Sequence, residues 1–378
     1  MSTLKVDNIR HNNATSDALV LSNDGSVAIG TCTAKLTSVG GAPLSNRNKV
    51  INGAMTISQR GTSFSGITGN SGTTRTLDRF KIQMTDLDQA VVTVSQDSSA
   101  PDGFANSLKI QCTTAETSVE NYEHARLMYD GEAFDFTDIG FGTPSAKKVT
   151  LSFWVKSNLT GTWGMNFWRG DANRSNLRTY TINSANTWEH KVITLVEDTT
   201  GGVVNSDNGY GLRINWGLAT GANFATSHPL DTWHGFQQQY FYPYDARNTN
   251  FYSSTSNNFY LTGVQLEVSD VATEFEHRHY TEELELCQRY YEAVYMTDGT
   301  AMFKSYESYG GSTNFEMQFK VEKRATPTWS LEGNAAWAGA TPNAFESKSG
   351  CIFQHNAGTQ FSLGDAHNDL CGSFSCEL

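Results

Sequence analysis

The stretch NFYLTGVQLEVSDVATEFEHRHYTEELELCQRYYEAV, which runs from Asn258 to Val294, contains two successive hydrophobic patterns. Its first part predicts a β-strand over residues 258–268, because apolar side chains recur there at nearly every second position. These apolar residues are Phe259, Leu261, Val264, Leu266 and Val268. Gly263 stands where the alternation changes phase, so we expect a β-bulge at this glycine.

The second part of the stretch predicts a short amphipathic helix over residues 279–295. Thr281 is a suitable N-cap, and Glu282 and Glu283 place negative charge in the first turn. An apolar seam follows at spacings of four and three residues: Tyr280, Leu284, Cys287, Tyr291 and Val294. We expect this seam to pack against the preceding β-domain, with a three-helix contact around a fibre axis as the alternative. The strand and the helix therefore divide the chain into two parts.

The composition of the 378-residue chain is typical of an all-β protein. Charged residues make up 17% of the chain, below the usual ~25% of soluble domains, and aromatic residues make up 12%. Short alternating segments are separated by Gly, Ser, Thr and Asn, which favours strands joined by turns. Strand and helix patterns do not alternate, which excludes a doubly wound α/β fold.

The net charge of −12 disfavours duplex nucleic acid or an anionic membrane as a partner. No apolar run reaches the ~20 residues of a membrane-spanning helix, so we expect no membrane insertion. The first residues, MSTLKVDNIRHNN, lack the apolar core of a secretory signal, and synthesis in a cytosol is expected.

The cysteines are scattered along the chain without CxxC pairs, so buried free thiols are predicted. A disulfide between Cys371 and Cys376 is the alternative. The six cysteines are Cys32, Cys112, Cys287, Cys351, Cys371 and Cys376.

We predict four segments: an N-terminal arm over residues 1–45, a β-sandwich over 46–278, a linker helix over 279–295 and a C-terminal β-domain over 296–378. The arm contains a predicted hairpin, in which residues 19–21 pair with 27–29 across an Asn-Asp-Gly-Ser turn. Because the arm has few large apolar residues, it needs a partner surface, and a frayed end without a partner is the alternative.

The predicted strands of the sandwich follow each other at short intervals, which favours a sandwich or jelly roll. They cover residues 50–57, 77–84, 90–95, 107–111, 125–128, 148–156, 163–168, 178–182, 188–195, 210–216 and 258–268. In the C-terminal domain, apolar and polar residues alternate from Phe315 to Val321, and further strands are predicted at 327–329, 352–353 and 361–363.

No catalytic signature is present in the sequence, and we expect a binding protein rather than an enzyme. Two stretches combine aromatic rings, which can cover the CH face of a sugar, with polar groups that hydrogen-bond its hydroxyls. The candidate glycan-binding residues are Trp168, Arg169, Asp171 and Arg174 in the first stretch, and Trp233, Tyr240, Tyr242, Tyr244, Asp245 and Arg247 in the second. As alternatives, Trp163 and Trp168 are core rings and the second stretch packs between subunits. Trp154, Trp188 and Trp216 are expected mostly in the core.

No metal or other cofactor is predicted. His277 and His279 would face the same side of an extended segment and are weak metal candidates, but a polar pair at a domain edge is the favoured interpretation. Asp78 and Glu267 lie in suitable places for a structural calcium ion, yet two carboxylates are too few to define a site.

Three parts of the sequence resemble tail-fibre and appendage proteins of tailed bacteriophages, especially marine ones. They are the stretch from Asn258 to Val294 quoted above, residues 46–63 (NRNKVINGAMTISQRGTS) together with Leu77-Asp78-Arg79-Phe80, and residues 323–329 (KRATPTW). In this group of proteins, a jelly-roll, carbohydrate-binding-like domain ends in such a strand and helix.

The resemblance implies a virion protein that is made in the host cytoplasm and assembles as a fibrous homotrimer. Residues 1–45 would attach it to the phage tail or to another virion component, and the rest would recognise a host surface glycan without catalysis. The alternatives are a polysaccharide depolymerase, or a purely structural capsid-decoration or tail-adaptor protein.

Overall fold

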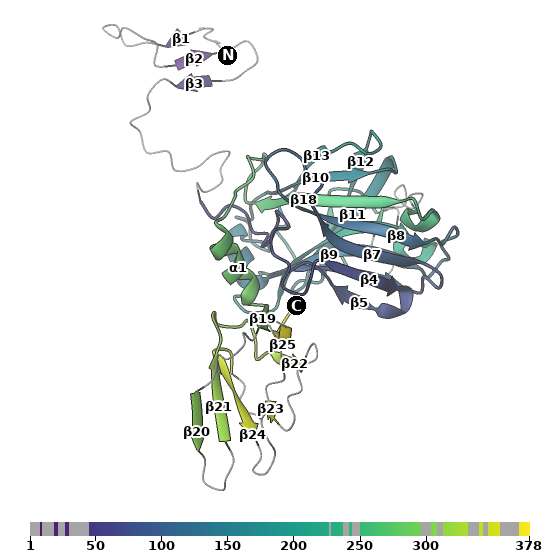
Figure 1. Ribbon diagram of the computed structural model, residues 1–378. Coiled ribbons are helices and arrows are strands. Elements are labelled where there is room, and N and C mark those ends of the chain that lie inside the picture. Colours follow the sequence, from purple (N-terminus) through teal and green to yellow (C-terminus); the bar gives the residue numbers. More distant parts are fainter. Residues whose placement is uncertain are drawn as a thin grey trace.

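The computed structural model describes residues 8–9, 19–21, 27–29, 45–226, 228–236, 242–243, 250–295, 304–307, 313–331, 340–342, 347–355 and 370–378. The largest part is a sandwich of two antiparallel sheets (Figure 1). Below the sandwich in this view lies a smaller β-unit, and the described chain ends between the two.

One sheet of the sandwich has six strands, in the order β13-β10-β18-β8-β7-β4. The bounds of these strands are β4 Ser63–Thr68, β7 Val91–Asp97, β8 Ser107–Thr114, β10 Val149–Ser157, β13 Glu189–Leu195 and β18 Asn258–Glu267. The other sheet has seven strands, in the order β16-β12-β11-β14-β9-β6-β5. Its strands are β5 Thr73–Arg75, β6 Phe80–Thr85, β9 His124–Glu132, β11 Gly161–Arg169, β12 Arg174–Ile182, β14 Tyr210–Thr220 and β16 Trp233–Gly235.

The chain passes repeatedly from one sheet to the other, as in a jelly roll, so the predicted all-β sandwich is confirmed. A parallel pair, β15 (Ala225–Thr226) and β17 (Tyr242–Pro243), lies outside these sheets. Short 3-10 helices connect some of the strands: η1 Gly69–Ser71, η2 Ala133–Ile139, η3 Ala222–Phe224 and η5 Phe251–Ser253.

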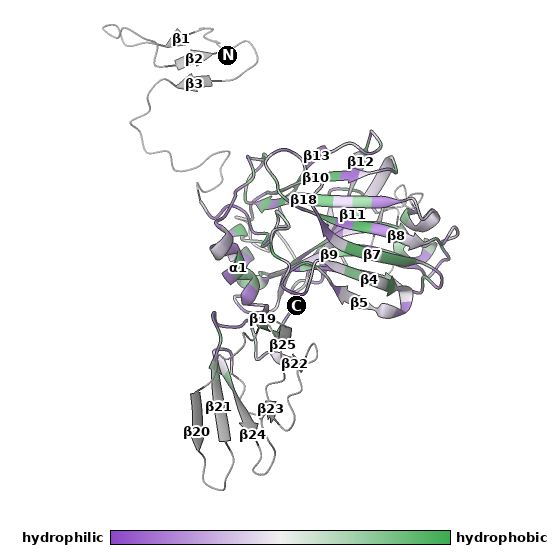
Figure 2. Cartoon of the chain, in the orientation of Figure 1, coloured by the Kyte–Doolittle hydropathy of each residue, from purple (hydrophilic) through white to green (hydrophobic). Residues whose placement is uncertain are grey.

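The core lies between the two sheets because alternate residues of each strand point inward. Phe153 of the six-stranded sheet packs against Tyr180 and Trp216 of the other sheet, at ring-centroid distances of 5.2 and 5.9 Å. Figure 2 shows hydrophobic and hydrophilic residues succeeding each other along β8 and β18. Trp163 and Trp216 are fully buried, whereas Trp154 and Trp188 are only half-buried. The prediction that Trp154 and Trp188 belong to the core is therefore wrong.

The predicted bulge at Gly263 is present. The register between β10 and β18 shifts there, since Ser152 pairs with Gln265 and Trp154 pairs with Thr262. Gly263 has a φ of +61°, and an added Cβ would lie 2.7 Å from the Phe104 ring and 2.9 Å from the Trp154 ring. A glycine is required at this position for both reasons.

The strand predicted over residues 50–57 is absent, and this segment forms turns instead. Asn52 and Met55 have φ angles of 60° and 56°, which are incompatible with a strand. The Asn52 side chain donates to the carbonyl oxygens of Ile57 and Asp78 and accepts from the Ile57 amide, at 2.8–2.9 Å. The apolar residues of this segment are buried by a folded-over loop, which the alternation alone does not distinguish from a strand.

The helix is shorter than predicted: α1 runs from Tyr280 to Gln288, and β19 (Tyr291–Tyr295) follows almost at once. The Nδ1 atom of His279, not the predicted Thr281, caps the helix by accepting from the Thr281 amide at 3.4 Å. Tyr291 and Val294, predicted to continue the helical seam, lie on β19. The pairing of this strand with β25 (Leu370–Ser375), a partner distant in sequence, overrides the local helical spacing.

Cys287 is the seam residue at the centre of the contact between α1 and the sandwich. It is buried in a cluster with Ile51, Ile57 and Tyr290, against which Leu284 packs. Tyr280, by contrast, is 60% exposed. The helix therefore packs against its own sandwich through part of the predicted seam.

The C-terminal unit contains two small sheets, β19-β25-β22 and β20-β21-β24-β23. The strands not yet given are β20 Lys304–Glu307, β21 Thr313–Gln318, β22 Thr328–Leu331, β23 Ala340–Pro342 and β24 Gly350–His355. Its described core consists of Val294, Met317, Phe319, Cys351 and Phe374. The strand predicted at 361–363 lies outside the described residues.

In the N-terminal arm, β1 (Asn8–Ile9), β2 (Leu19–Leu21) and β3 (Val27–Ile29) form a three-stranded sheet. The predicted pairing of β2 with β3 is confirmed, with Leu21 opposite Val27. Among the helices that the structure describes, none has the length and apolar character needed to cross a membrane.

The thiols of Cys112, Cys287 and Cys376 are free and buried, as predicted, so Cys376 forms no disulfide with Cys371, and Cys351 is also buried. Cys32 lies outside the described residues.

Candidate functional site

The outer face of the seven-stranded sheet is defined by its register. Trp168, Arg213 and Asp130 are cross-strand neighbours on β11, β14 and β9. The residues adjacent to them in each strand, such as Phe167 and Ile214, are fully buried in the core. Because successive side chains of a strand point to opposite faces, Trp168, Arg213 and Asp130 face away from the core.

Three aromatic rings surround an arginine on this face. The Trp168 ring lies 5.8 Å from Tyr210 and 5.7 Å from Phe236, measured between centroids. The Arg213 guanidinium lies 5.0 Å from the Trp168 ring and 5.1 Å from the Tyr210 ring, within cation–π range. All four side chains are half-buried, and we call them the Trp168 cluster.

Asp130 holds the arginine of the cluster in place. Its carboxylate accepts from Arg213 Nε at 2.5 Å and from Arg213 Nη2 at 3.1 Å, and it also pairs with Lys81. Burial would raise the pKa of Asp130, but Arg213 and Lys81 outweigh this effect and lower it. The carboxylate is therefore ionised and fixes the guanidinium against the rings.

A row of buried polar side chains lies beside the cluster on the same face. Asn166 and Asn215 are direct cross-strand neighbours, and Ser175 lies opposite Trp168. Asn215 donates to the Asn166 Oδ1 atom at 3.1 Å, but Asn166 Nδ2, Asn215 Oδ1 and Ser175 Oγ have no hydrogen-bond partner among the residues that the structure describes. A buried polar atom without a partner costs about 1–3 kcal/mol, so these three atoms favour any water or hydroxyl group that reaches them.

Of the predicted glycan-binding residues, Trp168 belongs to this face, whereas the others in its stretch hold a neighbouring loop. Arg169 is fully buried and forms an ion pair with Asp198. Arg174 Nε lies 2.9 Å from the same carboxylate. Asp171, although exposed, accepts from the amide and side chain of Asn205 at 2.8 and 3.0 Å. These contacts stabilise the loop over residues 197–205, and the glycan-binding role of the three residues stays a prediction.

The structure describes only part of the second stretch of predicted glycan-binding residues. Trp233 is 8% exposed, and its Nε1 donates to the Val196 carbonyl at 2.9 Å. The backbone of β17, which includes Tyr242, lies close to β11 and β12, the strands that carry Trp168 and Ser175. The side chains of Tyr240, Tyr242, Tyr244, Asp245 and Arg247 lie outside the described residues.

Sequence reasoning missed Tyr210, Arg213 and Asp130 as members of the site. A usable signal existed in the strand over 210–216, where Tyr210, Arg213 and Asn215 interrupt an apolar run at outward positions. The pairing of this strand with β11 could not be read from the sequence.

The weak metal candidates have other partners. The His277 ring packs against Phe104 and Phe275 at 5.3 and 4.9 Å, and His279 caps α1. Asp78 accepts from Gln59, and Glu267 accepts from Thr273. In the part of the chain that the structure describes, no group of three or more metal-ligating side chains is suitably arranged.

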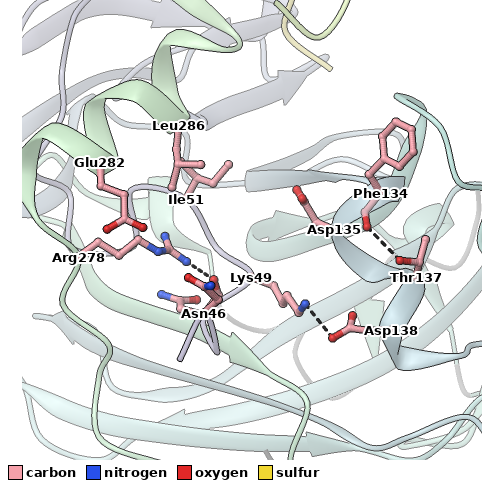
Figure 3. Close-up of a pocket in the computed structure, with 11 residues that line it drawn as sticks. Asn46, Lys49, Ile51, Phe134, Asp135, Thr137, Asp138, Arg278, Glu282 and Leu286 are labelled. Carbon is pink, nitrogen blue, oxygen red and sulfur yellow. Dashed lines mark hydrogen bonds and ion pairs between the residues drawn. The ribbon is translucent and has the colours of Figure 1, made fainter. Parts of the chain in front are cut away.

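A pocket of about 440 Å³ lies where the sandwich meets α1 (Figure 3). Lys49 and Asp138 form an ion pair of 2.9 Å in its wall, and Phe134 is 49% exposed. Burial, with the nearby Glu132, raises the pKa of Asp135. The lining residues are Asn46, Asn48, Lys49, Ile51, Phe134, Asp135, Thr137, Asp138, Arg278, Glu282 and Leu286. None of them belongs to the Trp168 cluster, so the pocket and the cluster are separate features.

No protein-family model and no curated protein sequence matches the chain. Among solved structures, the enzymatically active domain of tailspike protein 4 from bacteriophage CBA120 matches with 14% identity and a TM-score of 0.30, and the match covers 58% of this chain but only 21% of that one. TmCBM61 in complex with β-1,4-galactotriose matches with 8% identity and a TM-score of 0.28, over 58% of this chain and 98% of that one. The family 11 carbohydrate-binding module of cellulosomal cellulase Lic26A-Cel5E from Clostridium thermocellum matches with 12% identity and a TM-score of 0.27, over 57% and 98%.

Proposed function

We propose that this chain is a glycan-binding protein of a tailed-bacteriophage virion, and that its Trp168 cluster contacts the sugar. The observation that carries the proposal is the half-exposed Trp168 ring, with Tyr210 and Phe236 beside it and Arg213 fixed by Asp130. Aromatic faces pack against the CH face of a sugar ring, and guanidinium, amide and hydroxyl groups bond its hydroxyls. The arrangement provides both kinds of contact on one rigid sheet.

The assignment to a virion is supported by the resemblance of three sequence stretches to tail-fibre and appendage proteins. These stretches meet in space at the junction between the sandwich and the C-terminal unit. Gln59 donates to the Tyr291 carbonyl at 2.8 Å, and Lys323 donates to the Gln288 carbonyl at 2.5 Å. The three stretches that carry the resemblance, although distant in sequence, are therefore in contact in the folded chain.

In the proposed fibre, three copies of the chain assemble, and residues 1–45 attach each copy to the tail or to another virion component. Several copies on one particle raise the effective concentration of the second and later binding events, so weak individual sites suffice. Antibody labelling of intact particles, viewed by electron microscopy, tests the location: label at tail appendages supports the proposal, and label confined to the capsid contradicts it.

A binding measurement tests the site. The full chain should bind host envelope polysaccharide, and Trp168→Ala should weaken binding about tenfold, the effect of losing one aromatic hot spot. Phe134→Ala removes a more exposed aromatic ring outside the cluster and serves as the control, with unchanged affinity expected. Equal affinity of wild type and Trp168→Ala would contradict the proposed site. Recognition without catalysis also requires that incubation with the polysaccharide yields no new reducing ends.

A further inference from the structure

The outer face of the six-stranded sheet carries a second group of aromatic and basic side chains. Lys156 on β10 lies opposite Tyr260 on β18, and Tyr260 lies opposite Lys109 on β8. Their neighbours along these strands, such as Val155 and Leu261, are fully buried in the core. Lys156, Tyr260 and Lys109 therefore point away from the core, on the side of the sandwich opposite the Trp168 cluster.

These side chains touch one another and Trp188. The Trp188 and Tyr260 rings lie 6.0 Å apart in an edge arrangement. The Lys156 ammonium lies 5.0 Å from the Trp188 ring and 4.1 Å from the Tyr260 ring, and the Lys109 ammonium lies 5.4 Å from the Tyr260 ring. All four are half-buried, and we call them the Trp188 strip. Trp154, whose ring lies 5.1 Å from the His190 ring, extends the aromatic surface along β10.

Lys156 forms no ion pair with the residues that the structure describes. Its Nζ atom donates to Ser99 Oγ at 2.6 Å, and no carboxylate of the described residues lies within ion-pair distance of it. Burial lowers the pKa of Lys156, and the nearby Asp97 carboxylate offsets this effect only in part. Lys109 has only a long pair of 3.7 Å with Asp97. An anion would complete this site, although the chain as a whole carries a charge of −12.

We propose that the Trp188 strip binds a polysaccharide that carries carboxylate or sulfate groups. The rings of Trp188 and Tyr260 would cover sugar faces, and the two ammonium groups would pair with the anions. The strip extends over three adjacent strands, about 10 Å from β10 to β8, which suits a disaccharide unit of an extended chain. The inference goes beyond the proposed function, because it adds a second site on the other sheet and names the ligand's charge.

The test uses the full chain and three polymers: dextran, dextran sulfate and polygalacturonate. We expect binding to at least one of the two anionic polymers, weakened by added NaCl, and no binding to dextran at this site. Lys156→Met keeps the length of the side chain but removes its charge, and it should weaken binding at least fivefold. Trp188→Ala should also weaken binding at least fivefold. Because two independent variants are tested, poor folding of one of them does not decide the result.

Two controls separate this proposal from the first one. Lys147→Met removes the same charge from an exposed lysine outside the strip and should leave polymer affinity unchanged. Trp168→Ala should leave binding to the anionic polymer unchanged while it weakens binding to the host polysaccharide. The inference is overturned if neither anionic polymer binds, or if Lys156→Met and Lys147→Met have the same affinity, and neither result bears on the Trp168 cluster.

Discussion

Asp130 is the single residue on which the geometry of the Trp168 cluster depends most. It is 2% exposed and faces two cations, Lys81 and Arg213, on neighbouring strands. Other buried acids of the chain have similar roles: Asp198 pairs with Arg169, and Glu132 pairs with Arg289. Buried ions of this kind fix side-chain positions more than they add stability, because their pairing only offsets the cost of removing charges from water.

We predict that Asp130→Asn lowers the free energy of unfolding by about 3–5 kcal/mol, because it leaves two cations without a counter-ion. The effect should depend on pH. The folded pKa of Asp130 lies below its unfolded value of about 3.9, so its stabilisation is present above that pH and is lost as the pH falls through the folded pKa. Urea unfolding of both proteins at pH 7 and pH 3 checks this. A difference between them that does not shrink at pH 3 would contradict the role assigned to Asp130.

Strands in which apolar and polar residues alternate regularly could be predicted from the sequence. Segments with unusual backbone angles, and edge strands made mostly of polar residues, could not. The strands around Phe153, Trp163 and Leu261 were recognisable because each buries alternate apolar residues. The edge strands β4 and β5 were missed, since SFSGIT and TTR place few apolar residues inward.

The Trp168 cluster, too, could be predicted only in part. The Trp168 ring was identifiable from its local composition, but its partners Arg213 and Asp130 come from strands about 40 residues away in either direction. Only the register of β9, β14 and β11 brings them together. Likewise, Tyr291 and Val294 fit the spacing of the predicted helical seam. They form a strand instead because they pair with β25, which is distant in sequence.

The β-bulge at Gly263 in β18 leads to a prediction about stability. Gly263→Ala should lower the free energy of unfolding by about 1–3 kcal/mol, because the φ of +61° strains an L-residue and the new Cβ collides with the Phe104 and Trp154 rings. Gly235→Ala is the matched control, since its added Cβ meets no atom within 4 Å, and it should change stability by less than about 0.5 kcal/mol. Similar losses in the two variants, measured by thermal unfolding, would show that the bulge is not strained.

For the whole molecule, the junction between sandwich and C-terminal unit is a continuous buried polar interface rather than a flexible linker. Arg79 of the sandwich stacks on Tyr290 at 3.3 Å and pairs with Glu377 at 2.6 Å. Arg324 donates to the carbonyls of Cys376 and Asn208 at 2.8 and 2.6 Å. These contacts join residues 376–377, the segment that follows α1 and the sandwich into one unit.

A double-mutant cycle tests a buried ion pair within the C-terminal unit. Lys323 and Glu292 are 0% and 1% exposed and lie 2.5 Å apart. Lys323→Met should lower the free energy of unfolding by about 3–5 kcal/mol, because it leaves the Glu292 carboxylate buried and unpaired. The double variant Lys323→Met/Glu292→Met removes both charges and should recover most of that loss, as measured by urea unfolding. Additive losses would mean that the two groups do not interact in the folded protein.

Glycan binding at the Trp168 cluster is tested most directly by an experimental structure of the chain with an oligosaccharide cut from the host envelope. We predict a sugar ring packed against the Trp168 indole, with hydroxyl groups bonded to Arg213. A sugar bound elsewhere on the molecule, with the Trp168 cluster unoccupied at saturating ligand, would contradict it.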